Sequence, residues 1–209
     1  MKKAILFDFD GTIVDSMGEL AVWASKLINE HYELSIPIAR ELFLNTSGIP
    51  FCEQMEIIFP RGSKNAIIVN AFESKKEREF IHHKVFSDTQ DVFKYLRDKG
   101  YIVGISSSNM PRTIKEFLQG QGVEADEYLG FESAEFTKGK PHFEYIEKKY
   151  NISHEDIVFV GDSIKDGEKA ATNSIDFIAK TGINSREKFK TAYSNITIID
   201  TLNELKDIL

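Results

Sequence analysis

The hydrophobic pattern of the chain changes character twice along its length. Residues 4–9, AILFDF, form an apolar run that one aspartate interrupts, which is typical of a strand buried on both faces of a sheet. From residue 16 to about residue 83, apolar positions recur with helical spacing, as in ELAVWASKLINEHY at 19–32, and we find no convincing strand. From residue 89 onward, short apolar runs alternate with amphipathic segments. The pattern therefore predicts an α/β protein with an all-helical block inserted after its first strand.

The alternating part of the chain predicts four further strands and five helices. The predicted strands cover residues 101–106, 156–162, 174–180 and 196–200, and the predicted helices cover 89–100, 111–122, 141–151, 163–173 and 201–209. Such alternation predicts a Rossmann-like parallel sheet with helices on both faces. We expect two domains: an α/β core from residues 1–14 and 87–209, and a helical domain from residues 15–86.

Polar residues stand at the carboxyl ends of several predicted strands. Asp8 lies at the end of the first strand and Asp10 just beyond it, Ser106 closes the second, and Asp162 closes the strand that begins at residue 156. Ligands of open parallel sheets bind beyond these strand ends. An ionised carboxylate is costly to bury unless another group compensates its charge. The placement therefore predicts a site at this edge of the sheet.

Composition and charge narrow the class of partner. The 209 residues are 42% hydrophobic and 28% charged, as in a soluble globular protein, and the net charge of -7 is spread along the chain. An acidic surface disfavours nucleic-acid binding, and an anionic substrate would need local positive charge or a metal. The single cysteine, Cys52, allows no intrachain disulfide and suits a reducing cytoplasm. No apolar run predicts a signal peptide or a membrane span, and nothing in the sequence predicts the oligomeric state.

Four short motifs strengthen the prediction of a site. They are DFDGT at 8–12, ISSSN at 105–109, KGKP at 138–141 and GDSIKD at 161–166. In this order they resemble the four motifs of the haloacid dehalogenase (HAD) superfamily. The helical block resembles the C1-type cap domain of the subgroup that includes phosphoglycolate phosphatases and β-phosphoglucomutases. The resemblance implies a hydrolase of small phosphorylated metabolites.

The resemblance also implies roles for the acidic residues. Asp8 would be the nucleophile that forms an aspartyl-phosphate, and Asp10 the general acid and then the general base. Carboxylates alone would repel a phosphate dianion, so we expect a hard cation such as Mg²⁺. The ion would be held by the Asp8 carboxylate, the Asp10 backbone carbonyl and Asp162. Asp166, one helical turn beyond Asp162, would orient water in the second shell.

The remaining candidate residues would bind the phosphoryl group. Ser106 and Ser107 are the candidate substrate-binding hydroxyls, and which serine of ISSSN contacts phosphate is left open. Lys140, which precedes the proline of KGKP, would place a positive charge between Asp8 and the phosphate. His142 has no metal-ligand spacing, and we expect it at the surface or in a hinge.

Several other functions compete with a phosphatase. Relatives that cleave carbon–halogen bonds lack the second aspartate, and the phosphonate-hydrolysing branch replaces it, whereas Asp10 is present here. β-Phosphoglucomutases share all four motifs but have a histidine where this chain has Leu20. Receiver-type sensor domains lack both the helical insertion and D-x-D-G-T. The sequence therefore predicts a Mg²⁺-dependent phosphatase, with a phosphosugar mutase and a phosphate-sensing module as alternatives.

Overall fold

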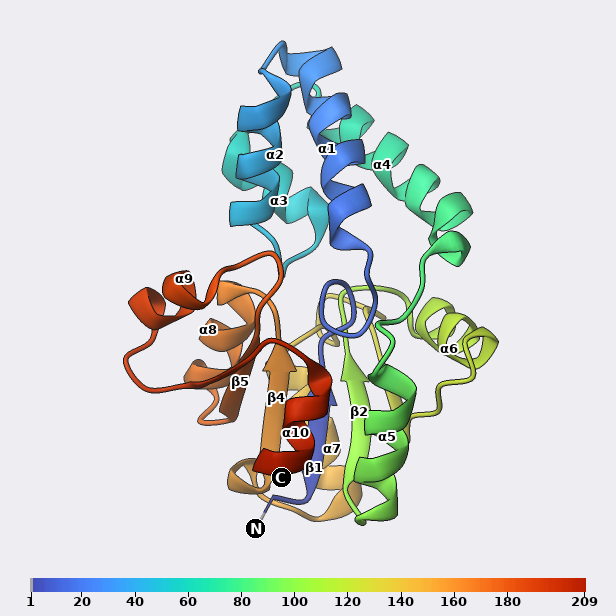
Figure 1. Ribbon diagram of the computed structural model, residues 1–209. Coiled ribbons are helices and arrows are strands. Elements are labelled where there is room, and N and C mark those ends of the chain that lie inside the picture. Colours follow the sequence, from blue (N-terminus) through green and yellow to red (C-terminus); the bar gives the residue numbers. More distant parts are fainter. Residues whose placement is uncertain (1) are drawn as a thin grey trace. The chain divides into compact units, whose positions relative to one another are not determined.

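The computed structural model describes residues 2–209, which form two compact units (Figure 1). One unit contains the residues up to Val14 together with Val85–Leu209, and the other contains Asp15–Lys84. The chain thus returns to the first unit at Val85, rather than at residue 87 as the sequence suggested. Val14 and Val85 form an isolated antiparallel bridge, so the two connections run side by side.

The first unit is built on a parallel sheet. Within residues 2–209 the sheet has six strands in the order β3-β2-β1-β4-β5-β6, and every neighbouring pair is parallel. The strands are β1 (Ala4–Phe7), β2 (Ile102–Ser106), β3 (Glu127–Leu129), β4 (Ile157–Gly161), β5 (Asp176–Lys180) and β6 (Thr197–Ile199). The predicted Rossmann-like α/β class is confirmed. Strand β3 was not predicted, because three residues beginning with a glutamate show no periodicity.

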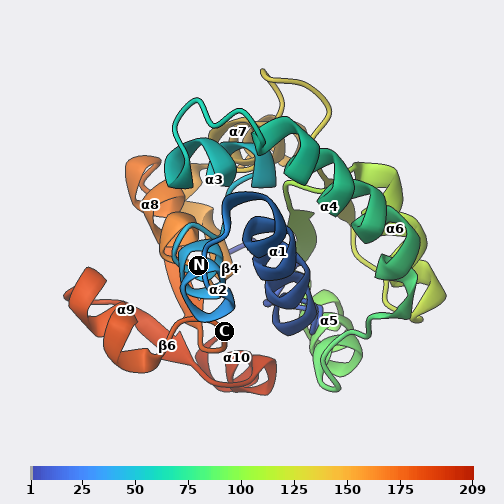
Figure 2. The ribbon, with the colours of Figure 1, turned by 90° about the horizontal axis from the view of Figure 1, so that it is seen from above.

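Helices cover both faces of this sheet. They are α5 (Thr89–Asp98), α6 (Pro111–Gly120), α7 (Lys140–Tyr150), α8 (Ile164–Thr172), α9 (Arg186–Ala192) and α10 (Leu205–Ile208). Helices α5 and α10 lie on one face and α7 on the other (Figure 1 and Figure 2). On the first face the rings of Phe7 and Phe93 pack with centroids 4.7 Å apart. On the second, Leu6 and Phe159 belong to a buried cluster that Phe143 of α7 completes.

The second unit is entirely helical over the residues that it contains, 15–84. Its helices are α1 (Met17–Tyr32), α2 (Ile36–Asn45), α3 (Phe51–Ile58) and α4 (Asn65–Glu79), followed by a 3₁₀ turn at Phe80–His82. Helix α1 lies between α2 and α4 in both views (Figure 1 and Figure 2). Trp23, Phe43, Phe51, Met55 and Phe72 belong to the buried cluster that holds the helices together. The unit therefore has a hydrophobic core of its own.

Strand register places the candidate residues at one edge of the sheet. Phe7 pairs with Ile105 of β2 and with Val160 of β4. The residue after each of these, Asp8, Ser106 and Gly161, therefore stands at the carboxyl end of its strand. None of the helices described between residues 2 and 209 is long and apolar enough to cross a membrane.

Candidate active site

The loop after β1 presents Asp8. The Asp8 N–H donates to the Val160 carbonyl at 2.8 Å, which extends the β1–β4 pairing by one residue and leaves the carboxylate buried. The chain then turns sharply, and the Gly11 N–H donates to the Val14 carbonyl at 2.8 Å. Gly11 has φ of 82°, in the left-handed region that favours glycine, which explains the glycine of DFDGT. The turn thus holds Asp8 at the end of β1.

A buried lysine contacts Asp8, and it is not the predicted one. Lys138 Nζ lies 2.5 Å from Asp8 Oδ1 and 2.6 Å from Asp166 Oδ1, and the residue is 6% exposed. Lys140 is exposed, and its Nζ pairs with Glu144 one turn along α7. The expectation that Lys140 stands beside Asp8 is therefore corrected. Lys140 is the first residue of α7, and Gly139, with φ of 111°, lies between it and the lysine that enters the site.

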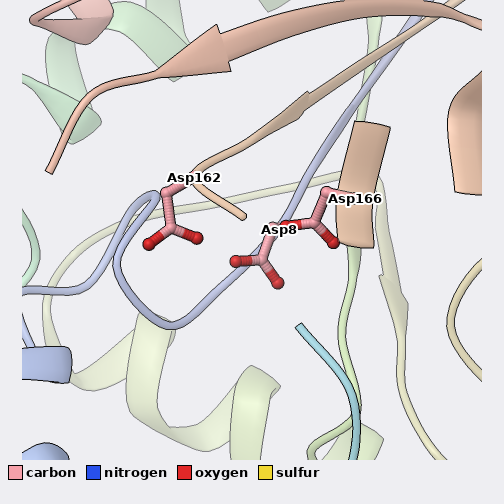
Figure 3. A group of neighbouring side chains, drawn as sticks. All are labelled: Asp8, Asp162 and Asp166. Carbon is pink, nitrogen blue, oxygen red and sulfur yellow. The ribbon is translucent and has the colours of Figure 1, made fainter. Parts of the chain in front are cut away.

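Three buried carboxylates gather at this edge of the sheet. One carboxylate oxygen from each of Asp8, Asp162 and Asp166 lies within 4.8 Å of the other two (Figure 3). Asp162 follows β4, and Asp166 lies in the first turn of α8, where Ser163 Oγ donates to its Oδ2 at 2.7 Å. A Cβ on Gly161 would lie 2.7 Å from the Asp166 Cβ, so only glycine leaves room for this carboxylate.

The charges of this cluster are unbalanced. Burial raises the pKa of Asp8 to about 6, with Lys138 opposing the rise and Asp166 adding to it. Burial, and then the charges of Asp8 and Asp166, raise the pKa of Asp162 well above its usual range. Burial would lower the pKa of Lys138, but Asp166 and Asp8 raise it above its usual range, so the ammonium stays charged. One ammonium therefore faces three carboxylates.

This arrangement fits a divalent cation. The Oδ2 atom of Asp162 is buried and has no hydrogen-bond partner among the described residues. Carboxylate oxygens are the ligands that hard cations such as Mg²⁺ prefer. The three carboxylates and the Lys138 ammonium leave two negative charges, which one divalent cation would neutralise. The residues present are thus suited to a hard divalent ion.

Asp10 lies outside that group of three carboxylates and is hydrogen-bonded to Asn109. The Asn109 Nδ2 donates to Asp10 Oδ2 at 2.8 Å, and the Asp10 carboxylate is not one of the three that lie together. Asn109 was not among the predicted site residues, although it is the last residue of ISSSN. The signal that could have identified it was its place in that motif, three residues beyond the end of β2.

The two candidate serines lie where β2 ends. Ser106 is fully buried, and its Oγ lies 2.9 Å from Nδ1 of His142. Ser107 Oγ accepts a hydrogen bond from the Asn109 N–H at 3.1 Å. His142 is itself fully buried rather than at the surface or in a hinge, because the start of α7 packs it against the end of β2.

Comparison with known proteins is consistent with this geometry. A family model described as haloacid dehalogenase-like hydrolase matches residues 5–180, which include all four motifs. The chain belongs to this family. The predicted resemblance to the HAD superfamily is confirmed.

The relatives of this HAD hydrolase include more than one activity. A phosphoglycolate phosphatase from Colwellia psychrerythraea is 25% identical over 98% of this chain and 95% of its own length. A haloacetate dehalogenase H-2 from Moraxella sp. is 24% identical over 98% of this chain and 99% of its own. Among solved structures, a predicted phosphatase from Clostridium acetobutylicum superposes with a TM-score of 0.81 at 22% identity, covering 100% of this chain and 98% of that one. The structural likeness shows the shared fold.

In this HAD hydrolase, His142 should make folding stability depend on pH. Burial lowers the pKa of His142 to about 4, while the unfolded chain titrates near 6.5. Between these values the unfolded state binds the extra proton, so stability is complete above pH 6.5 and falls as the pH drops towards 4. The difference corresponds to about 3 kcal/mol.

Urea unfolding of the wild type and of His142→Gln, measured from pH 7.5 to pH 4, checks this expectation. Glutamine does not titrate, so the free energies of unfolding of the two proteins should converge by about 3 kcal/mol as the pH falls. Parallel curves over this range would show that His142 is not held neutral by burial.

Proposed function

We propose that this chain is a Mg²⁺-dependent phosphatase that hydrolyses a phosphate monoester of a small metabolite through a phosphorylated Asp8. The observation that carries the proposal is the buried Asp8 carboxylate, held between Lys138 and the carboxylates of Asp162 and Asp166. A nucleophile in this position meets the phosphoryl group with a positive charge already beside it. The family match and the phosphatase relatives support the hydrolase assignment.

Asp8 performs the first step. One carboxylate oxygen attacks phosphorus, the bond between phosphorus and the ester oxygen breaks, and Asp10 gives its proton to the leaving oxygen. Thr12 Oγ1 lies 3.2 Å from Asp8 Oδ2 and Lys138 contacts Oδ1, so both oxygens have hydrogen-bond partners. Lys138 also supplies positive charge for the phosphoryl oxygens.

Asp10 performs the second step. It takes a proton from a water molecule that attacks the aspartyl-phosphate, the bond between phosphorus and the Asp8 oxygen breaks, and phosphate leaves. The hydrogen bond from Asn109 fixes the orientation of the Asp10 carboxylate for both transfers. The two aspartates of DFDGT thus have separate tasks.

The metal would be held by the Asp8 and Asp162 carboxylates and the Asp10 backbone carbonyl. Asp166, which is paired with Lys138 and Ser163, would not bind the ion directly but would orient water around it. When bound, Mg²⁺ supplies Lewis-acid stabilisation of the phosphoryl oxygens and neutralises the carboxylates.

Two alternatives fit the residues less well. The family resemblance assigns dehalogenases no second aspartate, whereas Asp10 is present here and oriented by Asn109. It assigns mutases a histidine at the position of Leu20, and this leucine is buried in the core cluster of the helical unit. Hydrolysis of a phosphate monoester is therefore the function that the site supports best.

Turnover of p-nitrophenyl phosphate with and without metal tests the proposal. We expect hydrolysis in the presence of Mg²⁺, its loss in EDTA, and its return with excess Mg²⁺. Asp162→Ala should lower both Mg²⁺ affinity, measured by titration calorimetry, and the rate. Asp98→Ala, which removes an exposed carboxylate of α5, is the matched control and should change neither.

Two results would contradict this assignment. One is full phosphatase activity in chelator. The other is metal-independent halide release from haloacetate by a protein that releases no phosphate from any member of a panel of phosphorylated metabolites. The same panel identifies the preferred substrate.

A further inference from the structure

A second buried lysine stands at the acidic edge of the sheet. Lys180 is the last residue of β5 and is 4% exposed. Gly161 pairs with Ala179, so Lys180 follows β5 at the level where Asp162 follows β4, and its positive charge opposes the rise in the pKa of Asp162. A buried ammonium is costly unless other groups compensate its charge. The contacts of Lys180 therefore indicate what this charge does in the site.

The Nζ atom of Lys180 contacts two segments that are far apart in the sequence. It lies 3.4 Å from the carbonyl oxygen of Gly11, in the turn after β1, and 3.9 Å from the centre of the Phe86 ring. The first contact is a charge-assisted hydrogen bond, and the second is a cation–π contact. Its contact with the Thr181 carbonyl, also 3.4 Å, stays within its own segment. Phe86 lies in the return connection, residues 85–88, which leads from the helical unit to α5.

The turn after β1 is held to the return connection at a second point. The Phe86 N–H donates to the Ile13 carbonyl at 3.0 Å, and Thr89 Oγ1 donates to the same carbonyl at 3.2 Å. These bonds fix the turn at Ile13, on the side that leads to the helical unit. The Lys180 contact fixes it at Gly11, from the end of β5.

Asp10 directly precedes Gly11, and its position depends on this turn. Its carboxylate accepts a hydrogen bond from Asn109, but the residue is only half-buried. Asp8, in contrast, is buried and is fixed by its backbone bond to β4. Proton transfer needs donor and acceptor atoms about 2.6–3.2 Å apart, and a misplacement of about 1 Å can cost on the order of 10²-fold in rate. A small movement of the turn would therefore impair the proposed acid and base more than the nucleophile.

We propose that Lys180 is a positioning residue for Asp10: its ammonium holds the turn at Gly11 and the return connection at Phe86 together, and so keeps the acid–base carboxylate in place. The inference rests on the proposed function and adds to that site a residue outside the four motifs. Lys138 contacts the nucleophile itself, whereas Lys180 acts through the backbone beside Asp10. These two lysines thus have different tasks.

Hydrogen exchange of the turn tests this contact without any measurement of activity. Lys180→Met keeps the length of the side chain but removes its charge and its donors, so a peptide containing residues 9–14 should exchange faster than in the wild type. Lys94→Met, which removes an exposed lysine of α5, is the matched control and should leave this exchange unchanged. Mass spectrometry gives the comparison, with peptides of the helical unit as internal references. Unchanged exchange of the turn in folded Lys180→Met would overturn the proposal.

Two substrates that differ in their leaving group test the role towards Asp10. Phenyl phosphate and p-nitrophenyl phosphate share a ring, but phenolate is the poorer leaving group and depends more on a proton from Asp10. Lys180→Met should therefore lower kcat/KM roughly tenfold more for phenyl phosphate than for p-nitrophenyl phosphate, a part of the 10²–10⁴-fold that general acid–base catalysis supplies. A role confined to folding stability would lower both values by the same factor, and that result would contradict the proposal.

Phe86→Leu tests whether the ring and the lysine act together. Leucine keeps an apolar side chain but removes the ring face that Lys180 contacts. This variant should show the same selective loss with phenyl phosphate in weaker form, because the hydrogen bond to Gly11 remains. In the double variant the combined loss should be smaller than the product of the two single losses, since both substitutions remove the same contact. Losses that simply multiply would show that the two residues act independently, contrary to the proposal.

Failure of this inference can be told apart from failure of the proposed function. A wild-type protein that hydrolyses neither phenyl ester nor any member of the metabolite panel overturns the proposed function, and the role of Lys180 towards Asp10 with it. A wild-type protein that is active, but in which Lys180→Met slows both phenyl esters equally, overturns only the inference.

Discussion

Asp8→Asn is expected to abolish turnover while leaving the protein folded and able to bind its substrate. Asparagine has nearly the same shape as aspartate, but its amide is a poor nucleophile. Loss of a nucleophile typically costs roughly 10⁴-fold or more in kcat. Because burial already disfavours the charge of Asp8, a neutral side chain of the same size is expected to be tolerated.

Steady-state kinetics on p-nitrophenyl phosphate, with inhibition by inorganic phosphate as the measure of binding, checks this expectation. Circular dichroism serves as the control for folding. A normal steady-state rate in Asp8→Asn would show that the covalent step uses another residue, and would overturn the mechanism.

Lys138→Met should damage both activity and stability. The lysine contacts Asp8 and Asp166 in a buried position, so its removal leaves two buried carboxylates without their cation. Breaking a buried ion pair in this way typically costs about 3–5 kcal/mol of folding stability. Loss of a positive charge at a developing anion typically lowers kcat on the order of 10²–10³-fold.

Lys140→Met is the matched control. This lysine is two residues away in the same KGKP motif, and its side chain is 67% exposed and pairs only one turn along its own helix. Its removal should change the free energy of unfolding by no more than about 0.5 kcal/mol and leave the rate unchanged. Urea unfolding and kinetics of the two variants together decide which lysine serves the site. Loss of activity in Lys140→Met with a normal Lys138→Met would reverse the assignment.

The sheet and its acidic edge could be predicted because each central strand is a clear apolar run and a polar residue stands at the end of each run. Apolar runs of five or six residues identified β1, β2 and β4, and parallel pairing then brings Asp8, Ser106 and Asp162 to one edge. The short strand β3 and helix α9 were missed, because neither has enough residues for a clear period.

The identity of the lysine depended on backbone geometry that the sequence does not show. KGKP offers two lysines on either side of Gly139, and the positive φ of that glycine separates the buried one from the one that begins α7. His142 and Asn109 were missed for a related reason. Each contacts a residue distant in sequence, Ser106 and Asp10 respectively, and such contacts leave no local pattern.

Trapping of the covalent intermediate in Asp10→Asn examines the proposed chemistry itself. This variant keeps Asp8 but has no base for the second step, and p-nitrophenolate leaves readily without an acid. General acid–base catalysis is typically worth about 10²–10⁴-fold, so hydrolysis of the intermediate should become much slower than its formation. Rapid-quench experiments with p-nitrophenyl phosphate should show a burst of p-nitrophenol, and Asp8→Asn should show none. Intact-mass and peptide analysis of the quenched protein should find one phosphoryl group, on Asp8. A phosphoryl group on another residue, or turnover without any adduct, would contradict a mechanism that passes through Asp8.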